Sequence, residues 1–253
     1  MKLTFKNHFS IKRTLKNKID WLFLKSMQGS VHLEKSNRIG RIQFFHPKGN
    51  SLPSSLLQNL VKAFEIAEDD PDIGVIILES EGNTFCAGAS LTELKGVKTL
   101  EEGTAFFMGF ADLLNTIRKM SKFVLASVHG KVVGGGVGLV SACDYAFATD
   151  TASLKLSELS IGLGPYVIEP AVSRKIGSTA FAQLSLDSTR WKSAQWGLQK
   201  GLYAECVADR EALDRTVNEN AERWANYAPE ACRELRKLHW KYTQNWESLL
   251  PEN

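Results

Sequence analysis

The chain has 253 residues, of which 43% are hydrophobic and 23% charged, as is ordinary for a globular protein of one large or two small domains. Its net charge of +3 is too small to predict nucleic-acid binding, and no apolar run reaches the roughly 18 residues that a membrane span needs. The four cysteines are widely spaced and fit neither a zinc site nor a disulfide framework. We therefore expect a cytoplasmic protein with reduced thiols.

Residues 1–30 form a basic extension. They contain seven lysine and arginine residues and a single acid, Asp20. Apolar residues recur at helical spacing between residues 11 and 25, which predicts a basic amphipathic helix. Such a helix could attach to an anionic membrane surface or an acidic partner. The alternative, which we favour, is a poorly ordered extension without a membrane role.

From residue 31 onward, predicted strands and helices alternate. Strands are expected at 41–45, 75–78, 122–128 and 144–149, and helices at 54–68, 99–120 and 137–143. Further helices are expected at 169–175, 179–186, 193–200, 210–227 and 229–246. Five tryptophans fall in these later segments and are expected to pack in the core or an interface: Trp191, Trp196, Trp224, Trp240 and Trp246. The order predicts an α/β core, residues 31–190, and a helical part, residues 191–253, of the same domain.

Two glycine-containing segments each follow a predicted strand. The first, 84–91, reads Thr-Phe-Cys-Ala-Gly-Ala-Ser-Leu, and the second, 129–138, contains Gly134-Gly135-Gly136 and opens a helix. Glycine lets a backbone approach a ligand, and a helix N-terminus carries unpaired N–H groups. Two such segments could direct two N–H groups at one carbonyl oxygen. The triple glycine could equally be a helix–strand packing contact, and neither segment matches a nucleotide-binding motif.

Several motifs, in the right order, resemble the crotonase (enoyl-CoA hydratase/isomerase) superfamily. They are Phe-Cys-Ala-Gly-Ala at 85–89, Gly130 with the run 134–136, Cys143-Asp144, and Leu-Ser-Glu-Leu at 156–159. The resemblance covers residues 31 to 246. The segments 46–53 and 156–165 are most similar to bacterial members named methylglutaconyl-CoA hydratase.

The resemblance implies a spiral of ββα units that assembles as homotrimers or hexamers and acts on acyl-CoA substrates. The thioester oxygen would bind the backbone N–H groups of Ala89 and Gly135, and Glu158 would be the catalytic acid/base. Further substrate-binding positions would be Ala87, Gly88, Gly134, Gly138, Tyr166 and Lys48. Coenzyme A would enter as part of the substrate, and no metal or redox cofactor is implied.

Gly138 stands where the family's hydratases carry a second catalytic glutamate. Hydration needs a base for water and a proton donor for the α-carbon, and one carboxyl can do both in turn. A single carboxylate also suits a Δ3-Δ2 enoyl-CoA isomerase, which only moves a proton. We expect an enoyl-CoA hydratase-type lyase, with the isomerase and a catalytically weak acyl-CoA-binding protein as alternatives.

Three local features leave alternatives open. Tyr166 could offer a hydroxyl or form an aromatic wall, and Lys48 could meet a CoA phosphate or remain solvated. His129 and Cys86 are expected to be packed residues rather than catalytic ones. The resemblance also implies a further helical segment after residues 245–247, which usually helps to cover the acyl-CoA site in the family. We expect this sequence to stop short of it, with residues 1–30 as a conjectured substitute.

Overall fold

The computed structural model describes residues 29–252, so the predicted extension lies almost wholly outside the described residues. A six-stranded sheet forms the centre of the molecule, in the order β1-β2-β4-β7-β9-β12. Its strands are β1 Ser30–Ser36, β2 Ile39–Phe45, β4 Val75–Ser80, β7 Phe123–Val128, β9 Tyr145–Thr149 and β12 Glu205–Val207. β1 and β2 are antiparallel, and every later pair is parallel. The α/β fold predicted from the sequence is confirmed.

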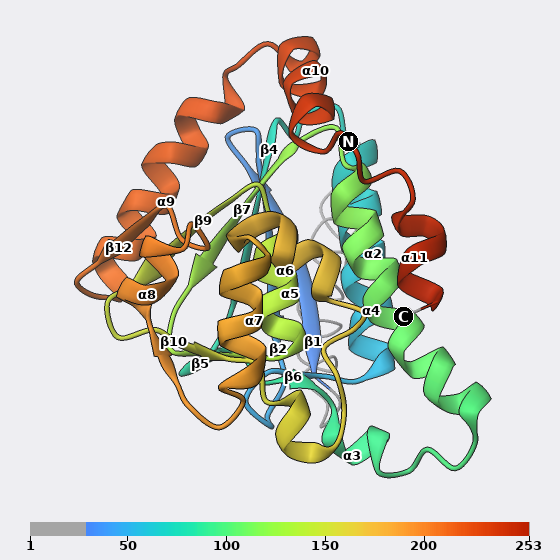
Figure 1. The fold of residues 1–253 in the computed structure, drawn as a ribbon. Coiled ribbons are helices and arrows are strands. Elements are labelled where there is room, and N and C mark those ends of the chain that lie inside the picture. Colours follow the sequence, from blue (N-terminus) through green and yellow to red (C-terminus); the bar gives the residue numbers. More distant parts are fainter. Residues whose placement is uncertain (1–28, 253) are drawn as a thin grey trace, which may run out of the picture.

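Helices cover both faces of this sheet, which explains why its central strands are continuously apolar. In β4, Ile76 and Leu78 join the core beneath α2 and α4, whereas Val75 and Ile77 pack against α9. Figure 1 shows α2, α4, α5 and α6 on one side and α9 on the other. The helices are α2 Ser54–Asp69, α4 Leu100–Lys119, α5 Gly135–Ala142, α6 Glu169–Ile176, α7 Ser178–Leu186, α8 Ala194–Gln199, α9 Arg210–Ala225, α10 Pro229–His239 and α11 Trp246–Glu252.

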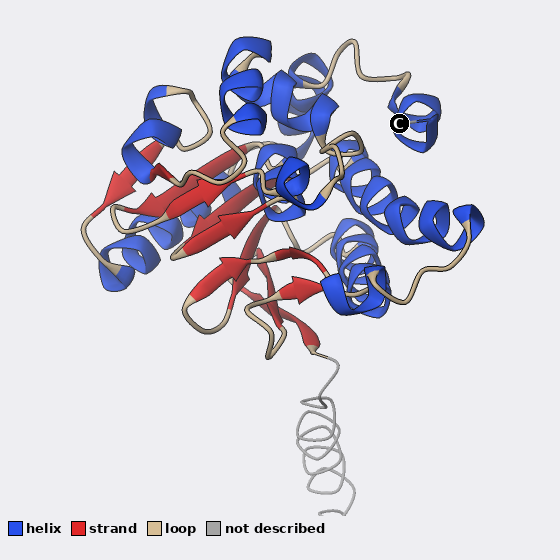
Figure 2. Ribbon diagram, turned by 60° about the horizontal axis from the view of Figure 1, so that its bottom comes forward, coloured by secondary structure: helices blue, strands red, loops and turns tan. Residues whose placement is uncertain are grey.

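Two small sheets carry the segments that the glycine motifs indicated (Figure 2). One has the order β11-β10-β8-β5, with β5 Thr84–Cys86, β8 Lys131–Val133, β10 Ser153–Lys155 and β11 Lys192–Ser193. The other pairs β3, Ser51–Leu52, with β6, Gly88–Ala89. These strands are two or three residues long, too short to show a period. The two glycine segments, which the sequence indicated as loops, therefore contain short strands. Pairing of these strands with their neighbours fixes the position of each segment.

Two expectations about the C-terminal part were wrong. The predicted helix 229–246 ends at His239, and α11 begins separately at Trp246. Tyr242 between them has φ of 69°, a left-handed conformation that ends a helix. Trp191 lies before β11 rather than in a helix and is partly exposed, with the ammonium groups of Lys131 and Lys155 over its ring. Residues 191–253 also add β11 and β12 to the sheets.

No helix within residues 29–252 is long and apolar enough to cross a membrane.

Candidate active site

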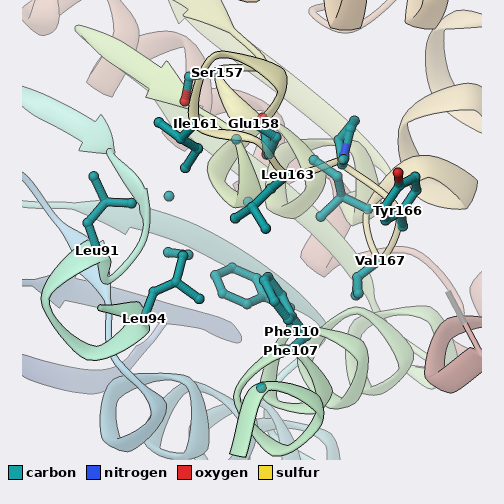
Figure 3. Close-up of a pocket in the computed structure, with 18 of the residues that line it drawn as sticks. Leu91, Leu94, Phe107, Phe110, Ser157, Glu158, Ile161, Leu163, Tyr166 and Val167 are labelled. Atoms are coloured by element: carbon teal, nitrogen blue, oxygen red, sulfur yellow. The ribbon is translucent and has the colours of Figure 1, made fainter. Parts of the chain in front are cut away.

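A cavity of about 420 Å³ lies where the two glycine segments meet (Figure 3). Its walls come from the end of β6 and the short helix α3, Leu91–Leu94, from the first half of α4, from the start of α5, and from residues 157–168. Leucine and phenylalanine side chains dominate these walls: Leu91, Leu94, Leu100, Phe107, Phe110 and Leu163. Among the described lining residues, Glu158 alone is charged. The cavity therefore suits an apolar group that reacts beside one carboxylate.

The first segment brings Ala89 to the wall of the cavity. β6 pairs with β3, and the next amide along, that of Ser90, donates to the carbonyl of Leu52 at 3.3 Å. Ala89 itself lines the cavity.

The second segment presents the N-terminus of α5. The first intrahelical bonds are donated by Val137 and Gly138 to the carbonyl of Gly134, so the amides of Gly135 and Gly136 precede the helical bonding pattern. Gly88 touches this segment, because a Cβ atom there would lie 3.4 Å from the nitrogen of Gly135 and 2.7 Å from the carbonyl oxygen of Val133. The two predicted donor segments are thus in direct contact.

Glu158 lies beside these amides, at the start of a single 3₁₀ turn, Glu158–Ile161. Its Oε1 is 2.7 Å from the place that a Cβ atom on Gly134 would occupy. Its Oε2 is buried and has no hydrogen-bond partner in the described part of the chain. Burial raises the pKa of this carboxyl, and hydrogen bonds from the amides of Glu158 and Ser157 oppose that rise. A carboxyl of raised pKa can both accept and return a proton near neutral pH.

The cavity brings together seven of the nine residues that the sequence singled out. They are Ala87, Gly88, Ala89, Gly134, Gly135, Glu158 and Tyr166. Lys48 does not line it, and its Nζ donates to Thr92 Oγ1 at 2.9 Å. Gly138 lies behind the wall, where a Cβ atom would meet Cγ2 of Ile168 at 2.5 Å. Tyr166 is 61% exposed and packs its ring on Gly164 at the edge of the cavity.

Sequence reasoning did not identify the apolar wall. Phe107 and Phe110 belong to a helix that was predicted, but its period does not tell which apolar residues face a cavity rather than the core. Ile168 gave no signal, because its importance depends on contact with Gly138, thirty residues earlier. Only the proximity of residues 84–91 and 129–138 could be anticipated, from their places after neighbouring strands.

Cys86 and His129 are structural residues, as expected. Burial raises the pKa of the Cys86 thiol to about 12, and its sulfur accepts a hydrogen bond from the amide of Gly88 at 3.4 Å. Burial also lowers the pKa of His129 to about 4, and its Nε2 donates to the carbonyl of Gly82 at 2.8 Å. Across residues 29–252, no three His, Cys, Asp or Glu side chains gather as a metal site.

Comparison with known proteins identifies the family of this chain. Residues 34–249 match the sequence model of the family described as Enoyl-CoA hydratase/isomerase. The chain belongs to the enoyl-CoA hydratase/isomerase family. Its relatives are named enoyl-CoA hydratases, so the chain is an enzyme of this family.

Individual relatives agree with this assignment. The chain is 26% identical to a Bacillus subtilis protein named "Probable enoyl-CoA hydratase", over 83% of this chain and 81% of that one. It is 31% identical to the mitochondrial enoyl-CoA hydratase of Pongo abelii, over 76% of this chain and 65% of the relative. It spans only 56% to 60% of the length of three Alternaria alternata enoyl-CoA hydratases.

Solved structures of the family superimpose well on most of the chain. A Legionella pneumophila structure named enoyl CoA hydratase/isomerase (crotonase) is 29% identical, with a TM-score of 0.80, and 85% of this chain and 84% of that one are covered. An enoyl-CoA hydratase/isomerase from Marinobacter aquaeolei is 26% identical, with a TM-score of 0.78, over 88% and 87% of the two chains.

Proposed function

We propose that this family member moves a proton at the α-carbon of an enoyl-CoA thioester and hydrates its double bond. The observation that carries the proposal is the buried carboxylate of Glu158 against Gly134, the residue that precedes the Gly135 amide. Family membership and the names of the relatives support hydration as the net reaction.

In this proposal, the thioester oxygen accepts hydrogen bonds from the amides of Ala89 and Gly135. Negative charge develops on that oxygen when electrons move from the double bond, and fixed N–H donors stabilise it. One such donor is typically worth about 3–4 kcal/mol of transition-state stabilisation. The apolar walls strengthen the effect by keeping the local dielectric constant low.

Glu158 acts in both halves of the hydration. Its carboxylate takes a proton from water as the water oxygen bonds to the β-carbon, and the π electrons move toward the α-carbon and the thioester oxygen. The carboxyl then gives a proton to the α-carbon and is a carboxylate again. The net change is the addition of one water molecule, and Glu158 ends as it began.

A second candidate reaction is migration of the double bond. It is favoured by the absence of another charged side chain among the described lining residues and by the position of Ile168 over Gly138. Glu158 would take a proton from the α-carbon of a 3-enoyl thioester, leaving a dienolate whose charge rests on the thioester oxygen. The same carboxyl would return the proton to the γ-carbon, so that no atom is gained or lost.

The acyl group that we propose first is 3-methylglutaconyl, on the strength of the sequence resemblance at 46–53 and 156–165. The apolar cavity suits the body of this chain, whereas its free carboxylate would have to remain at the solvent-facing edge near Tyr166. An unbranched enoyl group has no such requirement. We further propose a cytoplasmic homotrimer or hexamer, as the family resemblance implies.

Three substrates separate these possibilities: crotonyl-CoA, 3-methylglutaconyl-CoA and 3-hexenoyl-CoA, with products identified by chromatography and mass spectrometry. Glu158→Gln should lower turnover by about 10²–10⁴-fold, the usual effect of one acid/base. Calorimetry should show that thioester binding is retained. Glu222→Gln, an exposed change on α9, is the matched control. Tight binding without turnover of any of the three would instead support an acyl-CoA-binding protein.

A further inference from the structure

One face of α5 holds two side chains from the segment that follows β10. Glu158 Oε1 lies 2.7 Å from the position that a Cβ atom on Gly134 would take. Ile168 Cγ2 lies 2.5 Å from the position that a Cβ atom on Gly138 would take, so neither glycine has room for a side chain. Gly134 and Gly138 are joined by a hydrogen bond from the amide of Gly138 to the carbonyl of Gly134 at 3.3 Å. They are therefore about one helical turn apart, roughly 5–6 Å.

Glu158 and Ile168 both line the cavity, so Ile168 forms the wall next to the carboxylate along the helix. Figure 3 shows Glu158 above Leu163, with Tyr166 and Val167 along the same side of the cavity. Ile168 is 4% exposed, and its carbonyl accepts from the amide of Val172 at 3.0 Å in the first turn of α6. The backbone of Ile168 is thus fixed by α6. Its side chain fills the space left by the missing side chain of Gly138, which we call the notch at Gly138.

The consequence is an apolar side chain packed against α5 one helical turn from the position that contacts Glu158. Oε2 of Glu158 is buried and accepts no hydrogen bond from the described residues. A water molecule held beside a carboxylate needs two to four polar partners. Ile168 offers none.

We infer that Ile168 is a specificity-determining residue that sets the partition between water addition and double-bond migration. This inference rests on the proposed function. Both reactions use Glu158 and the same polarised thioester, and they differ in whether a water oxygen attacks the β-carbon. By filling the notch at Gly138, Ile168 disfavours a water next to Glu158, so the carboxyl returns its proton to carbon more often.

The test compares Ile168→Thr with Ile168→Val. The two replacements have nearly the same shape and differ by a hydroxyl, so their comparison cancels the lost methylene. The readout is the ratio of 3-hydroxyhexanoyl-CoA to 2-hexenoyl-CoA formed early from 3-hexenoyl-CoA, together with the initial rate of hydration of 2-hexenoyl-CoA. We expect Ile168→Thr to raise the ratio by about fivefold to tenfold over Ile168→Val, the size expected from one added hydrogen bond.

Val167→Thr introduces the same hydroxyl elsewhere on the cavity wall and tests whether its place matters. Equal ratios for Ile168→Thr and Ile168→Val, or an equal rise with Val167→Thr, would overturn the role of Ile168 while leaving the proposed function intact. A native protein that forms neither product would overturn this inference, and one that also leaves crotonyl-CoA and 3-methylglutaconyl-CoA unchanged would overturn the proposed function. Should Ile168→Thr fail to fold, Ile168→Ser and Ile168→Ala form a second matched pair.

Discussion

At the scale of single residues, the burial that suits Glu158 to proton transfer also lowers the stability of the folded chain at neutral pH. Burial raises the pKa of Glu158 in the folded chain above the ordinary value of 4.5. At pH values between 4.5 and the raised pKa, the folded chain therefore keeps a proton that the unfolded chain releases. Its stabilising contribution is complete below pH 4.5 and is lost as pH rises through the raised pKa. The group that is needed as a base is therefore a burden on folding at neutral pH.

Glu158→Gln should reveal this burden. Glutamine has nearly the same shape and never ionises, so we expect the variant and the native protein to have equal free energies of unfolding near pH 4. At pH 7 the variant should be the more stable one. Urea denaturation at both pH values measures the difference. Glu222→Gln should show no such pH dependence, and a Glu158→Gln protein less stable than native at pH 7 would contradict the prediction.

The close contact at Gly138 gives a second residue-scale prediction. Gly138→Ala places a methyl group 2.5 Å from Ile168 Cγ2 and 2.7 Å from Ile168 Cβ, so Ile168 must move into the cavity. Overpacking typically costs 1–3 kcal/mol, more than the roughly 1 kcal/mol that alanine gains in a helix. We expect a net loss of about 1 kcal/mol in the free energy of unfolding, with a higher KM for the thioester.

Gly103→Ala on α4 is the control for this change. Its new Cβ would meet only Val97 Cγ1 at 3.6 Å, an ordinary contact. It should be neutral or slightly stabilising. Combining Gly138→Ala with Ile168→Ala should recover part of the loss, and simple additivity of the two changes would show that they do not interact.

At the scale of elements, α10 is fastened to the core by one buried cation. Arg236, 2% exposed, donates through Nε to Asp144 Oδ2 at 2.8 Å. Its other nitrogens donate to the carbonyls of Ile117, Arg118 and Met120, at the C-terminal end of α4. The last carbonyls of a helix lack the usual donor four residues on, although that of Ile117 also accepts from the amide of Met120 at 3.3 Å. A cation there opposes the negative end of the helix dipole.

Arg236→Met should therefore cost about 3–5 kcal/mol, as expected when a buried ion pair loses one partner. The remaining carboxylate of Asp144 would keep only its neutral donors, the amide of Val124 and the indole of Trp240. Chemical denaturation measures the loss. Arg233→Met, an exposed change on the same helix, should lie within about 0.5 kcal/mol of native. A small effect at Arg236 would show that α10 docks by its apolar contacts alone.

The same region shows how far sequence patterns reach. Long elements with a clear period were predicted within a few residues, as for α2 and α4. The break between α10 and α11 was not, because Trp240 is held by Asp144, almost a hundred residues earlier. The strands β3, β5, β6 and β8 are too short for a period. They exist because neighbouring strands pair with them.

The candidate site divides in a similar way. Glu158 and the two glycine segments came from ordered motifs, and the cavity contains them all. The contact of Ile168 with Gly138 depends on how α6 packs on α5, which no local pattern encodes. The position of Lys48 against Thr92 is likewise a matter of tertiary packing, and its role toward a CoA phosphate stays a prediction.

At the scale of the whole molecule, large apolar side chains remain exposed on α10 and the turn that follows it. Leu238 is 64% exposed and Tyr242 82%, and Leu235 lies one turn before Leu238 on the helix. A spacing of three residues places Leu235 and Leu238 on one face of α10, and Tyr242 lies in the turn after the helix. Exposed apolar side chains that cluster are typical of a surface that a protein partner covers.

The proposed trimer would cover this face with a second copy of the chain. Analytical ultracentrifugation should then give a particle of three times the 28.1 kDa chain mass, or six times for the proposed hexamer. Leu238→Glu should dissociate it at micromolar concentration, because a carboxylate buried in an apolar interface loses its hydration without gaining a partner. Ile66→Glu on α2 replaces another exposed apolar residue and is the control. If both variants keep the native mass, this face of α10 is not the interface, and a native particle of a single chain would remove the trimer itself.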